Sequence, residues 1–311
     1  MDGWESIAAS AVPMTGGYGG ETYTVSAAGE DAVLRLYLRD PNRVSVDVAL
    51  MRLVRGILPV PRVLDAKLVG SVEDPPYVLC ERLPGVNLET YLPTAAEDQR
   101  RRIGEQLGEL LARLSGMPFL RGGMFEGDDL IPREFDLGEG GLVDWYRKHA
   151  AAIALDPVRG AKLTVVLAEV DDQVVLDEVD DQVELPPERF CLVHSDFNPK
   201  NLLVDPETAI ITGLVDWEFA HSGSPYTDLG NLLRFCDDPV LAGAVLDVVR
   251  RRAPALAEPL QRRAREADLW ALIELAGRAA QNPVAAAARD LLAQMAESGE
   301  LAAGRPDLDP A

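Results

Sequence analysis

The sequence predicts an α+β fold of two lobes, with a strand-rich lobe in residues 1–83 and a mainly helical lobe in residues 84–311. The chain has 311 residues, and this length favours two folded units of about 150 residues each. Its apolar residues alternate along the N-terminal part and recur at helical spacing along the C-terminal part. Because 47% of the residues are hydrophobic, the chain can bury a sizeable core, and a mainly disordered protein is excluded.

The N-terminal part contains three predicted strands, at residues 21–25, 31–38 and 77–80. In the second strand Arg35 and Tyr37 share one face, because successive side chains of a strand alternate. A glycine-rich turn at residues 16–20 precedes the first strand, and residues 81–85 form a predicted hinge after the third. A helix is predicted at residues 44–54, where an apolar face is followed by prolines that stop it.

The C-terminal part contains helices and one strand–loop–strand unit. Between residues 98 and 115, leucines and one isoleucine form an apolar stripe, which predicts a helix that packs on the core. Further helices are predicted at residues 141–152, 260–278 and 283–295. The strands of the strand–loop–strand unit are predicted at residues 190–193, 201–204 and 210–215. A polar loop joins the first two of these strands.

The chain is strongly acidic, with 51 Asp and Glu against 30 Lys and Arg and a net charge of −21. Such a surface repels nucleic acids and anionic membranes, so we expect neither as a partner, whereas cationic molecules are attracted. No apolar run is long enough to span a bilayer, and the first residues lack the features of a signal peptide. Cys80, Cys191 and Cys236 lie in apolar runs, which favours reduced core thiols in a soluble, cytoplasmic protein.

One short repeat lies within an acidic segment. Residues 169–174 recur as residues 178–183, and residues 169–188 hold nine acids and no base. Metal binding and the attraction of cations are two functions of acidic segments. We favour a tandem duplication in a solvated segment, because blocks of like charge repel one another and stay hydrated.

The residues that suggest chemistry lie in the polar loop and just beyond it. Residues 193–201 have the sequence Val-His-Ser-Asp-Phe-Asn-Pro-Lys-Asn, and Asp-Trp-Glu follows at residues 216–218. Asp196, Asn201 and Asp216 offer oxygen ligands at neighbouring strand ends, and Mg²⁺ takes one or two such groups together with water and phosphate oxygens. A carboxylate that is not needed by the metal can accept a proton from a hydroxyl. These parts favour phosphoryl transfer, although Asp196 and Asn201 also suit turn capping.

The pattern His194-x-Asp196-x₄-Asn201, followed by Asp216, resembles the kinase-like phosphotransferases of small molecules. This family includes aminoglycoside and other antibiotic phosphotransferases, choline kinase and homoserine kinase, and we favour the antibiotic branch. The resemblance covers residues 11–234. It implies the bilobal fold of protein kinases, with an antiparallel sheet and one helix in the N-lobe and a mainly helical C-lobe.

The resemblance implies a role for each matching residue of the C-lobe. Asp196 orients and deprotonates the acceptor hydroxyl, while Asn201 and Asp216 hold Mg²⁺ against the nucleotide phosphates. His194 supports the loop. Asp228 caps a helix and braces the loop, as a structural group and not as a substrate ligand.

In the N-lobe, members of this family place a basic residue on the third strand to bind the nucleotide phosphates. No lysine precedes Lys67, so Arg35 takes this position, where a guanidinium can bind phosphate bidentately. The helix acid that pairs with it is Asp47, one methylene shorter than the usual glutamate. Gly17 and Gly19 belong to the turn that covers the nucleotide, where glycine lets the backbone approach phosphates closely.

The hinge residues Glu81 and Leu83 are expected to offer backbone groups to the nucleobase. Backbone contacts leave no side-chain signature in a sequence. Both ATP and GTP therefore remain open as the nucleotide.

A protein kinase is the nearest competing interpretation. Asn198 stands where serine/threonine kinases have a lysine, and Asp-Trp-Glu replaces Asp-Phe-Gly at residues 216–218. Only eleven residues separate Asp216 from Asp228, which is too few for an ordinary activation segment. A small-molecule acceptor is therefore favoured.

The acidic balance favours a cationic acceptor, such as an aminoglycoside, a basic peptide antibiotic or choline. The acceptor class that we favour is an antibiotic of the aminoglycoside, macrolide or basic-peptide type. Glu266, Trp270 and Glu274 recur every four residues, so they share a helix face that can line a cation-binding cleft. An amphipathic surface helix explains the same spacing. Glu218 is a further candidate on the metal or substrate side of the site.

We therefore expect a Mg²⁺-dependent O-phosphotransferase that modifies an antibiotic and confers resistance, acting as a monomer or homodimer. A metabolic kinase of the choline, homoserine or sugar type is the first alternative. The second is a nucleotide-binding pseudokinase that regulates a partner, which the unusual Arg35 and Asp47 favour. The intact Asp196, Asn201 and Asp216 oppose it, because a protein that only binds nucleotide needs no proton acceptor there.

Overall fold

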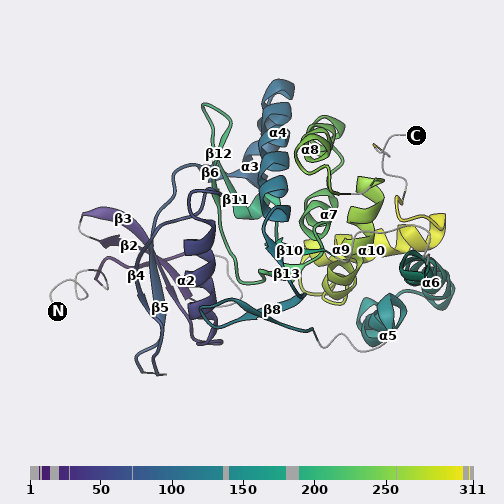
Figure 1. Cartoon of the computed structure of the whole chain (residues 1–311), viewed down its shortest axis with the longest axis horizontal. Coiled ribbons are helices and arrows are strands. Elements are labelled where there is room, and N and C mark those ends of the chain that lie inside the picture. Colours follow the sequence, from purple (N-terminus) through teal and green to yellow (C-terminus); the bar gives the residue numbers. More distant parts are fainter. Residues whose placement is uncertain are drawn as a thin grey trace.

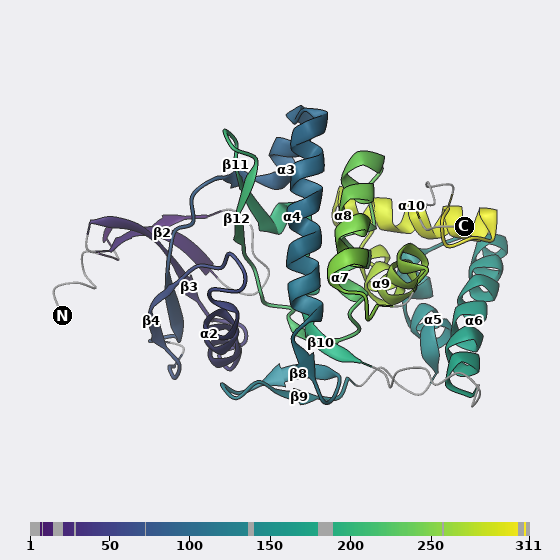
Figure 2. The same cartoon turned by 45° about the horizontal axis from the view of Figure 1, so that its top comes forward.

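The computed structural model describes residues 7, 9–14, 21–27, 29–71, 73–135, 140–179, 189–256, 258–303 and 308. Figures 1 and 2 show two lobes side by side, with the N-lobe sheet at the left and the long helix α4 (Glu97–Ser115) of the C-lobe near the middle. The predicted bilobal α+β fold is confirmed. None of the helices in the described part of the chain is both long enough and apolar enough to cross a membrane.

The N-lobe sheet has five antiparallel strands in the order β1-β2-β3-β5-β4. They are β1 (Val12–Pro13), β2 (Glu21–Ala27), β3 (Glu30–Leu36), β4 (Val63–Lys67) and β5 (Tyr77–Glu81). Strand β3 lies in the middle, where Arg35 stands opposite Thr22 of β2 and Val78 of β5. Pairing on both sides fixes the backbone of Arg35. The strands predicted in this lobe are β2, β3 and β5, whereas β4 was not predicted.

Helix α2 (Arg43–Val54) buries one face against each lobe. The residues that it contributes to the cluster under the sheet are Val44, Val48 and Met51. Those that it contributes to the main core, which is shared with the C-lobe, are Val46, Leu50 and Val54. Burial of an aliphatic side chain contributes about 1.5–3 kcal/mol, so α2 is anchored to both lobes at once.

The C-lobe is mainly helical. Its other helices in the described residues are α3 (Leu88–Tyr91), the 3₁₀ turn η1 (Leu92–Thr94), α5 (Gly141–Ile153), α6 (Pro157–Val179), α7 (Thr227–Leu233), α8 (Pro239–Arg252), α9 (Leu260–Ala276) and α10 (Pro283–Ser298). Helix α4 lies along α8, as Figures 1 and 2 show, and α5, α6, α9 and α10 enclose a second apolar cluster. The predicted helices are confirmed as α4, α5, α9 and α10, whereas α6 and α8 were not predicted.

Two small sheets carry the loops that hold the predicted site. One has the order β7-β10-β13-β8-β9 and the other the order β12-β11-β6. Their strands are β6 (Val86–Asn87), β7 (Pro118–Phe119), β8 (Gly123–Glu126), β9 (Ile131–Arg133), β10 (Phe190–Val193), β11 (Leu202–Asp205), β12 (Ile210–Leu214) and β13 (His221–Gly223). The polar loop joins β10 to β11, and the Asp-Trp-Glu segment lies between β12 and β13. Both segments therefore start at a strand end.

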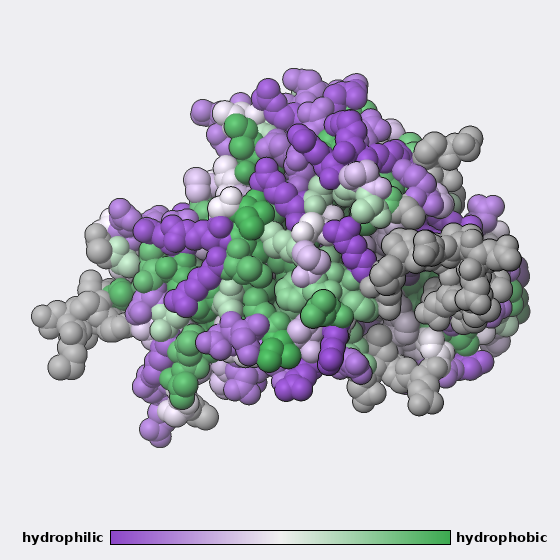
Figure 3. All heavy atoms as spheres, in the orientation of Figure 1, coloured by the Kyte–Doolittle hydropathy of each residue, from purple (hydrophilic) through white to green (hydrophobic). Residues whose placement is uncertain are grey.

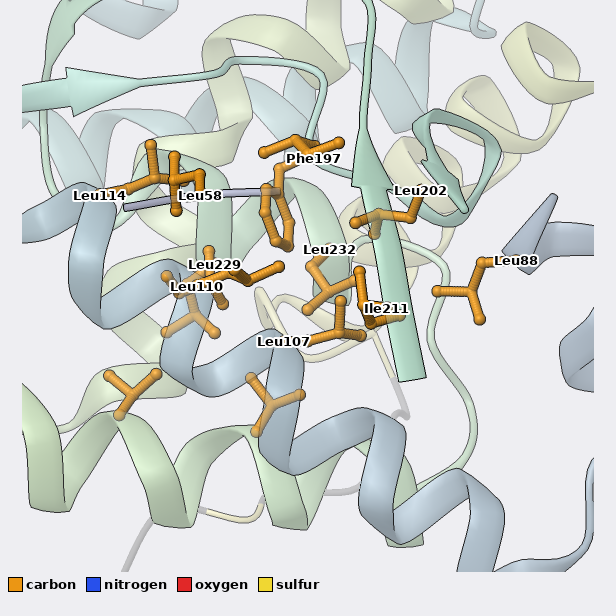
Figure 4. Close-up of a cluster of buried hydrophobic side chains, with 14 of the residues drawn as sticks. Leu58, Leu88, Leu107, Leu110, Leu114, Phe197, Leu202, Ile211, Leu229 and Leu232 are labelled. Carbon is orange, nitrogen blue, oxygen red and sulfur yellow. The ribbon is translucent and has the colours of Figure 1, made fainter. Parts of the chain in front are cut away.

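The main core runs from α2 through α4 to α7 and α8. Figure 4 shows Phe197 of the polar loop pointing into this core beside Leu110 and Leu229. Phe197 is fully buried, and it anchors the loop next to Asp196. On the outer surface, Figure 3 shows hydrophilic residues over the upper ends of the C-lobe helices and apolar residues gathered in the middle of the same face.

The acidic repeat begins inside a helix, and Glu169 and Asp172 of its first copy are exposed, as expected of a solvated segment. Helix α6 extends to Val179, and the second copy of the repeat continues outside the described residues. Asp171 in the first copy accepts hydrogen bonds from the backbone N–H groups of Leu142 (2.9 Å) and Val143 (3.2 Å). A carboxylate at these free N–H groups stabilises the start of α5. Part of the repeat is therefore built into the fold.

None of the three cysteines forms a disulfide, and Cys80 and Cys191 are buried. Burial raises the pKa of both thiols to about 12, so they stay protonated at neutral pH. Cys236 is only partly buried. The prediction of unpaired cysteines is confirmed.

Candidate active site

One buried carboxylate braces the loop between β10 and β11, which ends in the 3₁₀ turn η2 (Pro199–Asn201). Asp228, in the first turn of α7, accepts hydrogen bonds from the backbone N–H groups of His194 and Ser195, each at 2.8 Å. Ser195 has a φ of +67°, a conformation that costs free energy in a residue other than glycine and needs such support. The two bonds from Asp228 therefore hold the backbone just before Asp196.

His194 is a neutral structural link. Burial lowers the pKa of its ring to about 4. Its Nε2 lies 3.1 Å from the carbonyl oxygen of Val215 and its Nδ1 lies 3.3 Å from the backbone nitrogen of Asp196, so Nε2 donates and Nδ1 accepts. The ring also packs edge-on against Trp217, with centroids 4.7 Å apart. His194 thus joins the loop to the segment around Asp216.

The carboxylate of Asp196 lies among three donors. Asn198 Nδ2 is 2.5 Å from Oδ1, Asn201 Nδ2 is 2.7 Å from Oδ2, and Lys200 Nζ is 2.9 Å from Oδ2. The Asp196 side chain is 15% exposed, so solvent still reaches it. Sequence analysis assigns no role to Lys200, although its position four residues after Asp196 was a usable signal.

Asn201 and Asp216 lie on segments that are hydrogen-bonded to each other, since the Val215 N–H donates to the Asn201 carbonyl at 3.0 Å. The amide nitrogen of Asn201 donates to Asp196, which leaves the amide oxygen for a cation. Burial raises the pKa of Asp216, and the Arg35 guanidinium opposes that rise. An amide oxygen beside a carboxylate fits Mg²⁺, which leaves its other positions to water and phosphate oxygens.

Arg35 reaches this site from the N-lobe. Its Nη1 lies 3.2 Å from Asp216 Oδ1 and its Nη2 lies 2.5 Å from Glu218 Oε2. The guanidinium carbon lies 5.4 Å from the centroid of the Tyr37 ring. The Arg35 Nε is buried and has no hydrogen-bond partner among the described residues, which is costly for a charged donor. Burial and the neighbouring Asp216 raise the pKa of Glu218.

Asp47 has partners other than Arg35, which corrects the expected pair. Its Oδ1 accepts a hydrogen bond from Arg43 Nε at 2.8 Å, and its Oδ2 accepts one from the Tyr37 hydroxyl at 2.7 Å. The short aspartate side chain therefore binds the arginine one turn before it on α2. The i,i+4 spacing of Arg43 and Asp47 was the signal that sequence analysis missed.

The two predicted hinge residues make contacts within the chain. Glu81 ends β5, and its carboxylate lies 3.4 Å from Arg62 Nε. Leu83 packs beside Gly213 of β12, where a Cβ on the glycine would lie 2.8 Å from Leu83 Cδ1. Gly213 thus permits a close approach of the hinge to the C-lobe. Gly17 and Gly19 lie outside the described residues.

The predicted substrate face of α9 is occupied by other contacts. Glu266 and Glu274 each form an ion pair with an arginine four residues away in the chain. Trp270 packs against Trp145 of α5, with ring centroids 5.8 Å apart. This arrangement favours the amphipathic surface helix over a cation-binding cleft.

A cavity of about 940 Å³ opens beside Arg35 and Glu218. It is bounded by β3, the start of α2, the turn after β8 and the residues after Asp216. Its charged lining residues are Asp40, Glu126, Glu218, Arg35, Arg43 and Arg278. The three residues predicted on α9 do not line it, and the residue near the end of α9 that does is Arg278.

Comparisons with known proteins agree with this geometry. Residues 10–260 match the family described as "Phosphotransferase enzyme family". A mouse protein named acyl-CoA dehydrogenase family member 10 is 25% identical over 223 residues, which cover 68% of this chain and 19% of that protein. The chain therefore spans about a fifth of the length of this curated relative.

Solved structures share the fold. The aminoglycoside phosphotransferase APH(4)-Ia superposes with a TM-score of 0.62 at 22% identity, covering 93% of this chain and 94% of the other. The GDP and kanamycin complex of APH(2″)-IIIa superposes with a TM-score of 0.65 at 17% identity, covering 95% of both chains. Since the family match covers residues 10–260, which is most of the chain and includes the segments that carry Arg35, Asp196, Asn201 and Asp216, the chain belongs to the phosphotransferase enzyme family.

Proposed function

We propose that the protein transfers the γ-phosphoryl group of ATP or GTP to a hydroxyl of a small molecule, with Mg²⁺ held by Asn201 and Asp216. One observation carries this proposal: the chain brings two partly exposed carboxylates, Asp196 and Asp216, an amide oxygen and a two-branched cation to one place between the lobes. Phosphoryl transfer depends on such positioning and charge neutralisation.

In this mechanism Asp196 accepts the proton of the acceptor hydroxyl while the hydroxyl oxygen bonds to the γ-phosphorus. The bond from that phosphorus to the β–γ bridging oxygen breaks, and the nucleoside diphosphate leaves. Asn198 and Asn201 orient the Asp196 carboxylate through the bonds described above. Bound Mg²⁺ supplies charge neutralisation on the phosphates.

Arg35 supplies a second positive charge for the phosphates. Its contact with the Asp216 carboxylate, at the place proposed for the metal, supports this role. Structures of related proteins were solved with ADP and AMP-PNP for APH(4)-Ia and with GDP for APH(2″)-IIIa, so the family fold accepts both kinds of nucleotide. The hinge around Glu81 and Leu83 is proposed to contact the base, and we place the lobe boundary after Leu83.

The acceptor that we propose is a cationic antibiotic, whose modification confers resistance. The net charge of −21 supports the attraction of a cation, and the cavity has the volume of a small-molecule site. The APH(4)-Ia complex contains hygromycin B and the APH(2″)-IIIa complex contains kanamycin. Free cysteines favour a reducing compartment, so we place the reaction in the cytoplasm.

A metabolic kinase is the second candidate, and the cavity itself favours it. Three arginines line the cavity together with three acids. Arg278 reaches the cavity from the end of α9, where sequence analysis expected acidic substrate contacts. An acceptor that carries both an anionic and a cationic group, as a hydroxylated amino acid does, suits such a mixed lining.

The experiment measures nucleoside diphosphate release with Mg²⁺, ATP or GTP, and a panel of antibiotics and hydroxylated metabolites. Asp196→Asn is expected to reduce kcat by about 10²–10⁴-fold while nucleotide affinity is retained, because a general base contributes that much. Glu207→Gln, an exposed acid on the turn after β11, is the matched control. If kcat of Asp196→Asn equals that of the wild type, the assignment of Asp196 as the proton acceptor is wrong. Nucleotide binding without turnover on any acceptor supports the regulatory pseudokinase instead.

A further inference from the structure

Arg43 begins α2 and crosses from the N-lobe to the segment after Asp216. It is 9% exposed. Its Nη2 donates to the carbonyl oxygens of Trp217 (2.7 Å) and Ala220 (3.2 Å). The Ala220 N–H also donates to the Trp217 carbonyl at 3.0 Å, so these residues form a turn that the guanidinium caps. We call residues 217–220 the capped turn.

The other side of Arg43 is held within the N-lobe. Its Nε donates to Asp47 at 2.8 Å, and the second oxygen of Asp47 accepts the Tyr37 hydroxyl at 2.7 Å. Burial raises the pKa of Tyr37, so this hydroxyl remains a donor at neutral pH. Contacts within the N-lobe thus orient the Arg43 guanidinium toward the C-lobe and restrict its side chain to this conformation.

The N-lobe contacts Asp216 and the residues after it by two routes, one through Arg35 and one through Arg43. Tyr37 lies under the Arg35 guanidinium, and Arg35 contacts Asp216 and Glu218. One route from the N-lobe therefore reaches the Asp216 side chain through Arg35. The other reaches the backbone directly after Asp216 through Arg43.

The backbone of Asp216 needs this support. Its φ is +67°, which is uncommon for a residue other than glycine and persists only where the surroundings impose it. The capped turn starts at the next residue. If the turn loosens, Asp216 can relax and its carboxylate leaves the position in which it pairs with Arg35.

We propose that Arg43 is a positioning residue that fixes the capped turn to α2 and thereby sets the Asp216 carboxylate for metal binding when the lobes are together. The proposal rests on the proposed function, because it assigns Asp216 to the metal. It also gives Asp47 a role other than pairing with Arg35: Asp47 orients Arg43.

Two readouts test the proposal on the full chain. The first is hydrogen–deuterium exchange of the ligand-free protein over residues 214–222, which needs neither metal nor acceptor. The second is the dissociation constant of ATP and of GTP, measured by calorimetry with Mg²⁺ and again with EDTA. The variants are Arg43→Met and the conservative Arg43→Lys. Arg52→Met is the matched control, an exposed arginine on the same helix.

Arg43→Met is expected to speed exchange in residues 216–221 by at least ten-fold and to weaken nucleotide binding about ten-fold with Mg²⁺ but not with EDTA. Arg43→Lys restores part of both, since one ammonium can reach a carbonyl but cannot also replace the guanidinium bond to Asp47. Exchange that stays at the wild-type rate overturns the proposal. Binding that weakens equally with Mg²⁺ and with EDTA overturns it as well, because the residue then supports only the fold. If the wild type binds no nucleotide, the proposed function fails, whereas unchanged exchange remains the result that rejects the role of Arg43.

Discussion

Arg35 Nη1 lies 3.2 Å from Asp216 Oδ1, and this contact joins the middle strand of the N-lobe sheet to the segment between β12 and β13 of the C-lobe. The same guanidinium reaches Glu218 through its other branch. A lysine has a single ammonium and cannot hold two carboxylates in this planar arrangement. Arginine at this position is therefore suited to bridge the two lobes through both branches of its guanidinium.

Arg35→Lys is expected to weaken nucleotide binding about ten-fold, because the variant loses the bidentate geometry while keeping the charge. Calorimetric titration with ATP and GTP in the presence of Mg²⁺ measures the change. Arg52→Lys, on the exposed face of α2, should bind as the wild type does. Equal affinities for Arg35→Lys and the wild type would show that charge alone matters at this position.

Lys200→Met is expected to lower kcat by about ten-fold or more with little change in the thermal midpoint. Lys200 Nζ lies 2.9 Å from Asp196, where the phosphoryl group has to arrive, so its charge can stabilise the transition state. The lysine side chain is 53% exposed, and an exposed ion pair contributes only about 0–1 kcal/mol to stability. Steady-state kinetics and a melting curve separate the two effects. A drop in the midpoint with unchanged kcat would contradict the prediction.

Asp228 gives the pH dependence of stability a definite sign. Burial raises its pKa to about 7, against the effect of the two N–H groups that it accepts from. A raised pKa means that the folded state binds more protons than the unfolded state between about pH 4 and pH 7, so this contribution to stability is lost as the pH rises through that window. Buried His194 has the opposite effect, because its pKa of about 4 removes stability as the pH falls below about 6.5.

The difference between the wild type and Asp228→Asn isolates the carboxyl group, since His194 is common to both. We expect the Tm of the wild type minus that of Asp228→Asn to fall as the pH is raised from 4 to 7. Melting curves at five or six pH values measure it. A difference that grows with pH would mean that the two backbone donors outweigh burial and keep Asp228 ionised.

Local patterns in the sequence were sufficient for much of the fold. The alternation around Arg35 and the leucine stripe of α4 each report one buried face, and both elements are where they were predicted. Helix α8 was not predicted, because its buried face is built largely from alanine and valine. These residues give a weak amphipathic pattern at helical spacing. The turn after β8 was not predicted for another reason. The strands that it joins, β8 and β9, have only a few residues each, which is too short to show the alternation of apolar and polar residues typical of a strand.

The candidate site was predictable only in part. Asp196, Asn201 and Asp216 have characteristic spacing, and the structure brings their segments together. The i,i+4 spacing indicates that Arg43 can pair with Asp47, but it does not decide between Arg43 and Arg35, because that choice depends on the reach of a short side chain across the space between β3 and α2. The cavity lining combines residues distant in sequence, such as Asp40 and Arg278, and no local pattern reports such a combination.

Gly104 of α4 and Gly243 of α8 allow the effect of helix propensity on stability to be distinguished from the effect of packing between the helices. A Cβ on Gly104 of α4 would lie 2.6 Å from the Leu241 carbonyl oxygen and 2.8 Å from the Ala244 Cβ of α8, so alanine cannot fit unless the helices move apart. Helix propensity alone favours alanine over glycine by about 1 kcal/mol, whereas overpacking costs about 1–3 kcal/mol.

Gly104→Ala is therefore expected to lower the Tm, although propensity alone predicts a rise. Gly243→Ala is the matched control: it lies on α8 with no atom within 4 Å of the added Cβ, and it should raise stability by about 0.5–1 kcal/mol. Melting curves of the two variants measured side by side decide the question. If the Tm rises in both variants, α4 and α8 are not packed as closely as the contacts of Gly104 require. If the Tm falls in Gly104→Ala and rises in Gly243→Ala, the close approach of the two helices, and not the helix propensity of either one, requires glycine at residue 104.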